Sequence, residues 1–238
     1  MNTSFESWFA LLLATDAPAL PSLSLLQNWL PLGWGVVLAW LCVGAMARWM
    51  PGTDRVEGRQ FAAAVLVLLS MGLPGPYSPA YWLGLAFQAP SVVTVLWCAR
   101  CLVERWVPSS AGQPPATGEN RLQMWLAVVG VLVGWALLLD TFALLLLQLY
   151  AWGFSPAAVG LLAVAAVSPW LVSGGGPQPV RTHAWVAPLA LLMFAAWRLP
   201  TGNVWDAVLD PWLWIALHVY LGRKVWVRNR PRGFPLIT

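Results

Sequence analysis

The sequence predicts an all-α fold: a polytopic membrane helix bundle of seven transmembrane helices, with the N-terminus outside and the C-terminus in the cytoplasm. Three observations lead to this prediction. The 238-residue chain is 59% hydrophobic, only 9% of its residues are charged, and its basic residues gather on one side of the apolar segments. Because soluble domains usually contain about 25% charged residues, the expected solvent for most of this chain is lipid.

Seven apolar segments appear when the chain is divided at charges and at Pro/Gly clusters. Helices are the expected form, because backbone groups in hydrocarbon must be hydrogen-bonded within the segment and the alternating pattern of a membrane barrel is absent. The segments are Leu32–Arg48, Phe61–Leu73, Ala80–Val103, Leu122–Tyr150, Pro156–Val172, Ala184–Leu199 and Val204–Leu221.

Two flanking regions complete the predicted organisation. Residues 1–31 have no basic residue before their apolar stretch, so we expect an uncleaved amphipathic interfacial helix followed by a connector on the outer face. Residues 32–222 form the seven-helix transmembrane domain, and residues 223–238 form a basic cytoplasmic tail. The apolar face of the interfacial helix consists of Phe5, Trp8, Phe9 and Leu12.

The orientation follows from the distribution of Lys and Arg, because cytoplasmic loops retain positive charge. If the chain crosses seven times, only Arg198 lies on the outer side. Twelve of the thirteen basic residues are arginine, which is typical of GC-rich bacteria, so we expect a multi-pass protein of the bacterial cytoplasmic membrane. The cytoplasmic group is Arg48, Arg55, Arg59, Arg100, Arg105, Arg121, Arg181, Arg223, Lys224, Arg228, Arg230 and Arg232.

Apart from Asp206 and Asp210 at the outer start of the last span, Asp140 is the one acidic residue inside a predicted span, and burial in hydrocarbon is costly for a carboxylate. We expect it to face the third span and form an intramembrane polar cluster with Gln88, Ser91 and Thr94, near the carbonyl group that Pro90 leaves free. Such a cluster serves either as polar contact between helices or as a proton or cation relay in which Asp140 titrates.

The second span is short, and a proline-rich segment from Pro74 to Tyr81 follows it. Irregular backbone at membrane depth is tolerated when it is covered by protein or lines a wet cavity. One interpretation is an outer vestibule formed by Pro74, Tyr77 and Tyr81, with Tyr77 largely covered by protein. The alternative is an ordinary surface loop.

Two further pairs of residues are candidate ligands. Asp206 and Asp210 lie one helical turn apart and could hold a cation, although an Asp followed by Pro211 is also typical of a helix N-cap. His183 and His218 fall towards the cytoplasmic half and are weak candidates for a haem or metal site, because no ligand-type spacing ties a carboxylate or Cys to them. We therefore predict no metal centre and no cofactor.

The sequence has none of the common hydrolase, metalloprotease or phosphate-binding motifs, and no catalytic residues are assigned. We expect a non-catalytic integral membrane protein that serves as a packing, assembly or accessory subunit of a larger membrane complex. Its expected partners are the lipid bilayer and other membrane protein subunits, not nucleic acid. The alternative is a small-solute or proton-coupled transporter with an outer vestibule and Asp140 as its titrating residue.

Overall fold

A computed structural model describes residues 10–15, 18–49, 54–107, 117–172 and 185–228, which form helices and no strand. The predicted all-α class is therefore confirmed. The helices are α2 (Leu23–Trp49), α3 (Asp54–Met71), the 3-10 helix η1 (Gly75–Tyr77), α4 (Pro79–Phe87), α5 (Val92–Trp106), α6 (Thr117–Thr141), α7 (Leu149–Trp152), α8 (Pro156–Val172), α10 (Val186–Trp197), α11 (Val204–Val208) and α12 (Pro211–Arg228).

Seven of these described helices contain twelve or more residues, and each overlaps one of the seven predicted segments. Two stretches, Leu23–Trp49 and Gln123–Thr141, are long and apolar enough to cross a membrane. Two shorter helical stretches, Pro156–Ser168 and Val186–Trp197, are also apolar. The described part of the chain thus contains two candidate membrane spans.

The first long helix, α2, begins at Leu23 and not at Leu32, so the end of the predicted connector is helical. Ser22 starts it, because its carbonyl accepts from the Leu26 N–H at 3.1 Å. Pro31 lies inside α2. The predicted boundary was wrong because proline often ends a helix, whereas here the helix continues past it.

Only part of the predicted interfacial helix is described. Residues 10–13 form a helical turn in which the Leu12 side chain is exposed. Phe5, Trp8 and Phe9 lie outside the described residues.

The third predicted segment is two helices, so a single continuous helix from Ala80 to Val103 is wrong. Gln88 ends α4 with a φ of 61°, and Pro90 has no N–H with which to continue a helix. Ser91 then caps α5, because its Oγ accepts from the Thr94 N–H at 3.1 Å.

The fourth predicted segment is also divided, because α6 ends at Thr141. The Ala143 N–H donates to the Asp140 carbonyl, and the Leu144 N–H donates to the Leu139 carbonyl, both at 2.9 Å. With Ala143 at a φ of 55°, these bonds form a Schellman motif, which satisfies the last carbonyls of the helix. The predicted continuation to Tyr150 was wrong because a uniformly apolar sequence does not mark this end.

Ala143 occupies a left-handed position that favours glycine. Ala143→Gly should therefore raise the free energy of unfolding by about 1 kcal/mol, since glycine adopts this conformation without the clash of a Cβ. Thermal unfolding in detergent, followed by Trp fluorescence, measures the effect. Ala143→Ser is the matched control, because serine keeps the Cβ and should give no gain. Equal gains from both variants would contradict the conformational explanation.

The last predicted segment is divided as well, into α11 and α12, by Leu209 and Asp210. Leu209 is extended, with φ and ψ of −139° and 120°, and Pro211 occupies the first position of α12. A proline there is favourable because the first helical N–H needs no partner within the helix. The predicted single helix from Val204 to Leu221 was therefore wrong.

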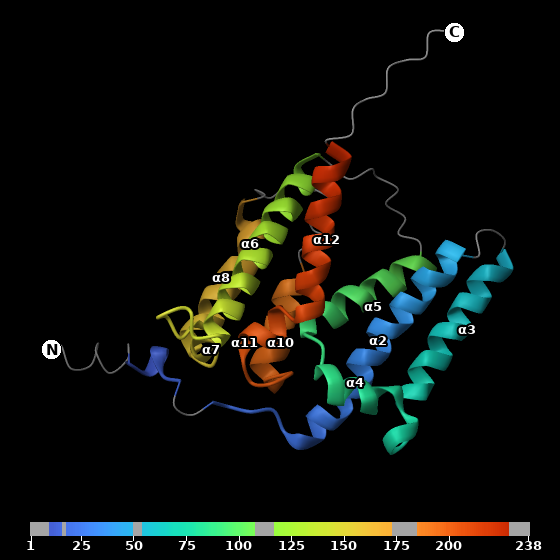
Figure 1. The fold of residues 1–238 in the computed structure, drawn as a ribbon, viewed down its shortest axis with the longest axis horizontal. Helices are drawn as coiled ribbons and strands as arrows, with labels where there is room; N and C mark the ends of the chain where they lie inside the picture. The colour runs from blue at the N-terminus through green and yellow to red at the C-terminus, as the bar shows by residue number, and fades with distance from the viewer. Residues whose placement is uncertain (1–9, 16–17, 50–53, 108–116, 173–184, 229–238) are drawn as a thin grey trace, which may run out of the picture.

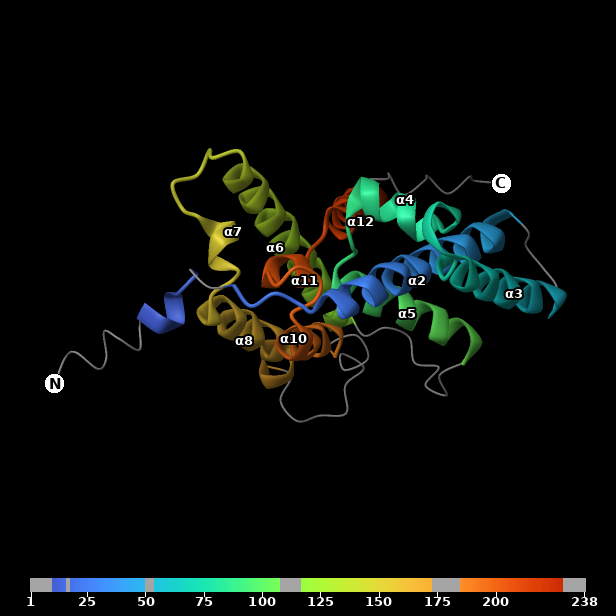
Figure 2. The same ribbon diagram turned by 90° about the horizontal axis from the view of Figure 1, so that it is seen from below.

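The helices form two groups that meet at α5 (Figures 1 and 2). Helix α5 contacts α2 on one side, and α10 and α11 on the other, while α6 packs along α12 and α8 packs along α10. The short helices α4, α7 and α11 lie towards the end of the molecule opposite the C-terminal end of α12 (Figure 1).

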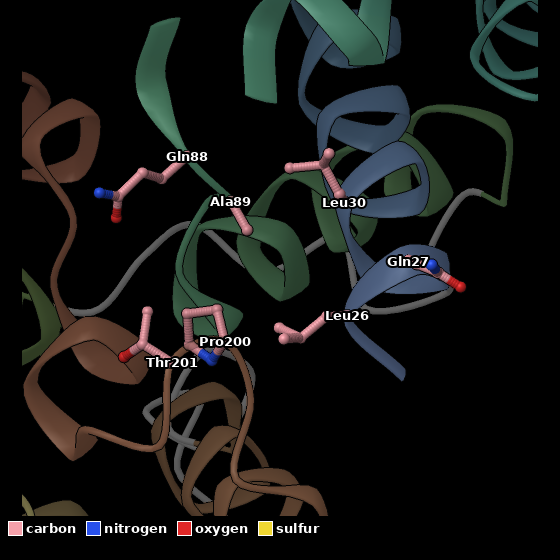
Figure 3. Close-up of a pocket in the computed structure, with 7 residues that line it drawn as sticks. All are labelled: Leu26, Gln27, Leu30, Gln88, Ala89, Pro200 and Thr201. Atoms are coloured by element: carbon pink, nitrogen blue, oxygen red, sulfur yellow. The ribbon is translucent and has the colours of Figure 1, made fainter. Parts of the chain in front are cut away.

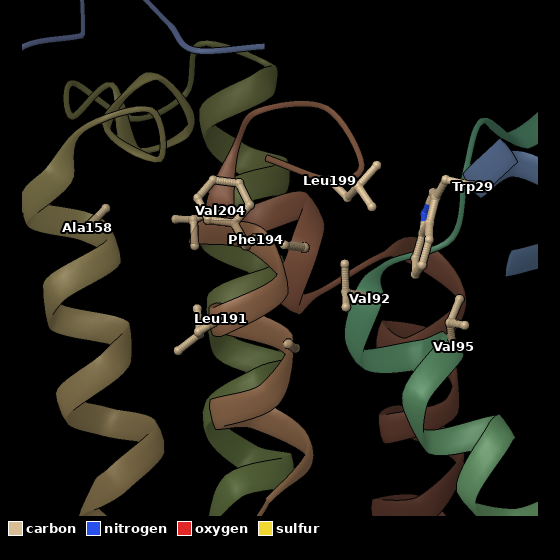
Figure 4. Packing of buried hydrophobic residues seen from close by; sticks show 10 residues of the cluster. Trp29, Val92, Val95, Ala158, Leu191, Phe194, Leu199 and Val204 are labelled. Atoms are coloured by element: carbon tan, nitrogen blue, oxygen red, sulfur yellow. The ribbon is translucent and has the colours of Figure 1, made fainter. Parts of the chain in front are cut away.

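One buried apolar cluster holds the groups together (Figure 4). It places Trp29 of α2 and Val92 of α5 in the same core as Phe194 of α10 and Val204 of α11. Phe194, Val92 and Val204 are fully buried. Burying such side chains stabilises the fold by about 1.5–3 kcal/mol each, so this core fixes the ends of α5 and α11.

Candidate functional site

Two interrupted helices meet at Asp210, a buried residue with 7% of its surface exposed. One carboxylate oxygen, Oδ2, accepts from the Ser91 N–H at the start of α5 at 2.7 Å. The other, Oδ1, accepts from the Leu213 N–H in the first turn of α12, also at 2.7 Å. A single side chain thus caps two helices that are 119 residues apart in sequence.

The electrostatics of this junction are favourable for a negative charge. Unpaired N–H groups and the helix dipole place partial positive charge at a helix N-terminus. Asp210 lies at the N-terminal ends of both α5 and α12. The carboxylate therefore compensates both helix ends and ties them together.

Ser91 and Thr94 complete the junction on the α5 side. The Ser91 hydroxyl donates to the Thr94 Oγ1 at 2.8 Å and accepts from the Thr94 N–H, and both side chains are buried. These bonds satisfy the Thr94 N–H in the first turn of α5 and join the two hydroxyl groups. The start of α5 is thus capped by its own side chains.

Two tryptophans of α2 satisfy the carbonyl groups at the same break. Trp34 Nε1 donates to the Gln88 carbonyl at 2.7 Å, and Trp29 Nε1 donates to the Pro90 carbonyl at 3.3 Å. Trp34 also forms an aromatic cluster with Phe87 and Trp212, in which the Phe87 and Trp212 ring centroids are 5.0 Å apart. Residues from α2, α4 and α12 therefore enclose the break.

No known protein family, curated protein or solved structure matches this chain. Asp210 has two oxygens and each already accepts a backbone N–H. Among the described residues, no group of three or more His, Cys, Asp or Glu side chains could hold a metal ion. The described arrangement is suited to holding two helix ends in register.

The predicted polar cluster has a different carboxylate from the one expected. Ser91 and Thr94 do lie together, but the carboxylate beside them belongs to Asp210 and not to Asp140. Asp140 Oδ2 instead accepts from the Tyr150 N–H at 2.8 Å. Gln88 contributes its carbonyl group to the junction, while its side chain is exposed. The predicted partner was wrong because α6 ends one residue after Asp140, which leaves the carboxylate free to cap α7.

Asp140 acts as a local cap for α7 in this structure, and this contact predicts the result of two substitutions. Asp140→Asn should lower the free energy of unfolding by less than about 1 kcal/mol, because the amide oxygen can still accept from the Tyr150 N–H. Asp140→Ala should cost about 1–2 kcal/mol, because that N–H loses its partner. Thermal unfolding of the two purified variants tests this order. Equal losses would show that the negative charge is what stabilises α7.

The predicted outer vestibule is not formed by the residues assigned to it. Tyr77 is 80% exposed, so the prediction that protein covers it is wrong. Pro74 is also exposed, and Tyr81 is 42% exposed. The segment folds as η1 and the start of α4, and the Trp82 indole bonds to the Pro76 carbonyl. The Tyr77 side chain therefore projects away from the protein, whereas Ser78 and Ala80 of the same segment are buried.

The two other predicted carboxylates are held by separate contacts. The N-cap interpretation of Asp210 is confirmed by its bond to the Leu213 N–H. Asp206 accepts hydrogen bonds from the Tyr150 and Thr201 hydroxyls. Burial and the neighbouring Asp206 carboxylate raise the pKa of Tyr150, which lies beyond the end of α6, so its hydroxyl stays protonated as a donor.

Asn203 and the start of α11 are fastened to α7 by hydrogen bonds to backbone carbonyls. Asn203 is fully buried, and its Nδ2 donates to the Tyr150 carbonyl at 2.8 Å. Trp205 Nε1 donates to the Leu149 carbonyl at 2.8 Å, and the Val204 N–H donates to the Gly153 carbonyl at 3.0 Å. Tyr150, Asn203 and Asp206 therefore form one structural network.

Of the two predicted histidines, His183 lies outside the described residues. His218 is held by two tryptophans: Trp135 Nε1 donates to its Nε2 at 3.2 Å, and its Nδ1 lies 2.8 Å from the Trp214 carbonyl. Since Nε2 accepts, Nδ1 carries the proton and donates. His218 therefore joins α6 to α12.

Sequence reasoning missed the contact surface between α6 and α12. Gly130 and Gly134 form a Gly-x-x-x-Gly pattern on α6, a spacing that allows close helix approach in membranes. A Cβ added at Gly134 would lie 2.2 Å from the Trp214 ring, and one at Gly130 would lie 2.7 Å from Leu217. The spacing of the two glycines was the available signal.

Proposed function

We propose that this protein is a seven-span subunit of the bacterial cytoplasmic membrane, with its N-terminus outside, that packs against other membrane proteins and carries out no catalysis. The main supporting observation is the apolar surface of α6. One side of this helix packs on α12, while the apolar side chains elsewhere along it are largely uncovered by the rest of the chain. The uncovered residues include Trp125, Leu126, Val129 and Leu132.

The use of polar groups in the fold also supports a structural role. Asp140, Asp206 and Asp210 each accept hydrogen bonds from N–H or O–H groups of the chain itself. Carboxylates used in this way stabilise helix ends and loops. A subunit whose task is lateral packing needs such a rigid frame.

Site-specific photo-crosslinking tests the proposed role. Benzoylphenylalanine is placed at Leu126, Val129 or Leu132 on α6, and at the similarly exposed Leu66 and Leu69 on α3 as comparison sites. We expect protein adducts of one discrete mass from the α6 positions after irradiation of intact membranes, and weaker or different adducts from α3. Lipid adducts alone at all five positions would contradict a partner on α6.

The proposed orientation gives a second test. Reporter fusions at Gly112 and at the C-terminus should both indicate the cytoplasm, because basic residues flank these sites. Replacing the five basic residues from Arg223 to Arg232 with glutamine should reduce the fraction of molecules with a cytoplasmic C-terminus. A periplasmic signal from either fusion in the unaltered protein would contradict seven spans with the N-terminus outside.

A small-solute or proton-coupled transporter is the second candidate, and one observation favours it. Interrupted helices that meet near a buried charge are a recurrent feature of transporters, and two such interruptions meet at Asp210. Transport predicts proton flux into proteoliposomes, reported by trapped pyranine, that Asp210→Asn abolishes while the folded yield is retained. Flux equal to that of protein-free liposomes would favour the packing subunit.

A further inference from the structure

A pocket of about 400 Å³ lies beside the α4–α5 break (Figure 3). Its walls come from the first turns of α2, from Gln88 and Ala89, and from Pro200 and Thr201. Leu26 and Leu30 point from α2 towards Ala89 and Pro200, whereas the Gln27 amide points away. The volume is within the usual range of about 300–1,000 Å³ for small-molecule sites.

The lining selects for an apolar ligand. Leu26, Leu30, Ala89 and Pro200 supply apolar surface, and none of the residues that line the pocket is charged. The Thr201 hydroxyl is already bonded to Asp206. A charged solute would lose its hydration here without gaining a partner, whereas an alkyl chain gains free energy when its methylenes are buried.

The walls are held in place by contacts outside the pocket. The bonds from Trp34 and Trp29 fix the carbonyls on either side of Ala89. Leu30 packs closely on Gly84, where an added Cβ would lie 2.6 Å from the leucine Cδ2. The pocket is therefore part of the folded structure without a ligand.

The neighbouring surface indicates where an alkyl chain would come from. Leu23, one turn before Leu26 and Gln27, and Leu32, just after Leu30, are exposed apolar residues of the same helix. If α2 crosses the membrane as proposed, this surface faces the acyl chains of the outer leaflet.

We propose that the pocket binds one acyl chain of a membrane phospholipid. The chain lies between Leu26, Leu30, Ala89 and Pro200. This inference rests on the proposed membrane location of α2. It adds a specific lipid site to the proposed packing function.

Photolabelling in nanodiscs tests the proposal with the full-length chain. The probe is a phosphatidylglycerol with a diazirine in one acyl chain, and a diazirine-bearing palmitic acid is the second arm. Peptide mass spectrometry should find stronger phospholipid labelling around Leu30 and Ala89 than around the exposed Leu66 of α3. Labelling by palmitic acid alone would overturn the assignment to a phospholipid.

Substitutions that fill the pocket are compared with a substitution on the exposed side of the same helix. Leu26→Trp should reduce labelling around Ala89 about tenfold, the effect of losing about two buried methylenes. Leu32→Trp, on the exposed side of the same helix, should leave that labelling unchanged. Ala89→Leu fills the pocket from the opposite wall and should reduce labelling around Leu30.

The outcomes separate this inference from the membrane location itself. Labelling around Leu66 without enrichment at the pocket, or no response to either pocket-filling variant, would overturn the lipid site while leaving the membrane location intact. No labelling at Leu66 or at the pocket would overturn both.

Discussion

Asp210→Ala should lower the free energy of unfolding by about 3 kcal/mol, because it removes acceptors from two helix N-termini at once. The Ser91 and Leu213 N–H groups each lose a bond of 2.7 Å. Loss of one N-cap costs about 0.5–2 kcal/mol, and a buried bond to a charged group is worth about 1.5–3 kcal/mol. The Trp fluorescence midpoint of thermal unfolding should fall by about 5–10 °C.

Two variants separate the cap from the charge. Asp210→Asn keeps one oxygen acceptor and should cost about half as much as Asp210→Ala. Ser91→Ala retains the backbone N–H bonded to Asp210 and removes only the side-chain contacts with Thr94, so its loss should be smaller than that of Asp210→Ala. If Asp210→Ala unfolds at the same temperature as the unaltered protein, the carboxylate does not join the two helices.

Gly134→Ala should also destabilise the protein strongly, by about 1–3 kcal/mol. The added Cβ would lie 2.2 Å from Trp214 Cδ1 and 2.3 Å from its Nε1. Since Trp214 Nε1 donates to the Val131 carbonyl at 3.1 Å, displacing the ring also weakens that bond. The expected result is a lower unfolding midpoint and looser packing of α6 on α12.

Gly222 provides the matched control, because it lies on α12 and an added Cβ there meets nothing within 4 Å. Gly222→Ala should be neutral or stabilising by up to about 1 kcal/mol through helix propensity. Thermal unfolding of the two variants, followed by Trp fluorescence, measures the difference between them. Equal effects of the two glycine substitutions would exclude steric contact as the cause.

The two aspartates show why the predicted cluster was only partly right. Asp140 lies in a long apolar run that was expected to form one unbroken helix. In such a helix Asp140 would lie at a membrane depth similar to that of Ser91 and Thr94, so it was their expected partner. Asp210 precedes a proline and was correctly interpreted as a cap. Its second bond, to Ser91, depends on how α5 and α12 meet, and no local pattern around Asp210 contains that information.

The sequence by itself determined the helical class, the approximate location of the seven longest described helices but not their ends, and the N-cap role of Asp210. These follow from composition, apolar periodicity and the Asp-Pro pair, which act locally. Only the tertiary structure decided that Gln88 and Ala143 end helices inside apolar runs, that Tyr77 is exposed, and that Asp140 bonds to Tyr150. The physical reason is that a backbone group at a helix end takes whichever partner the packed chain places within reach, and in a uniformly apolar segment several ends are locally almost equivalent.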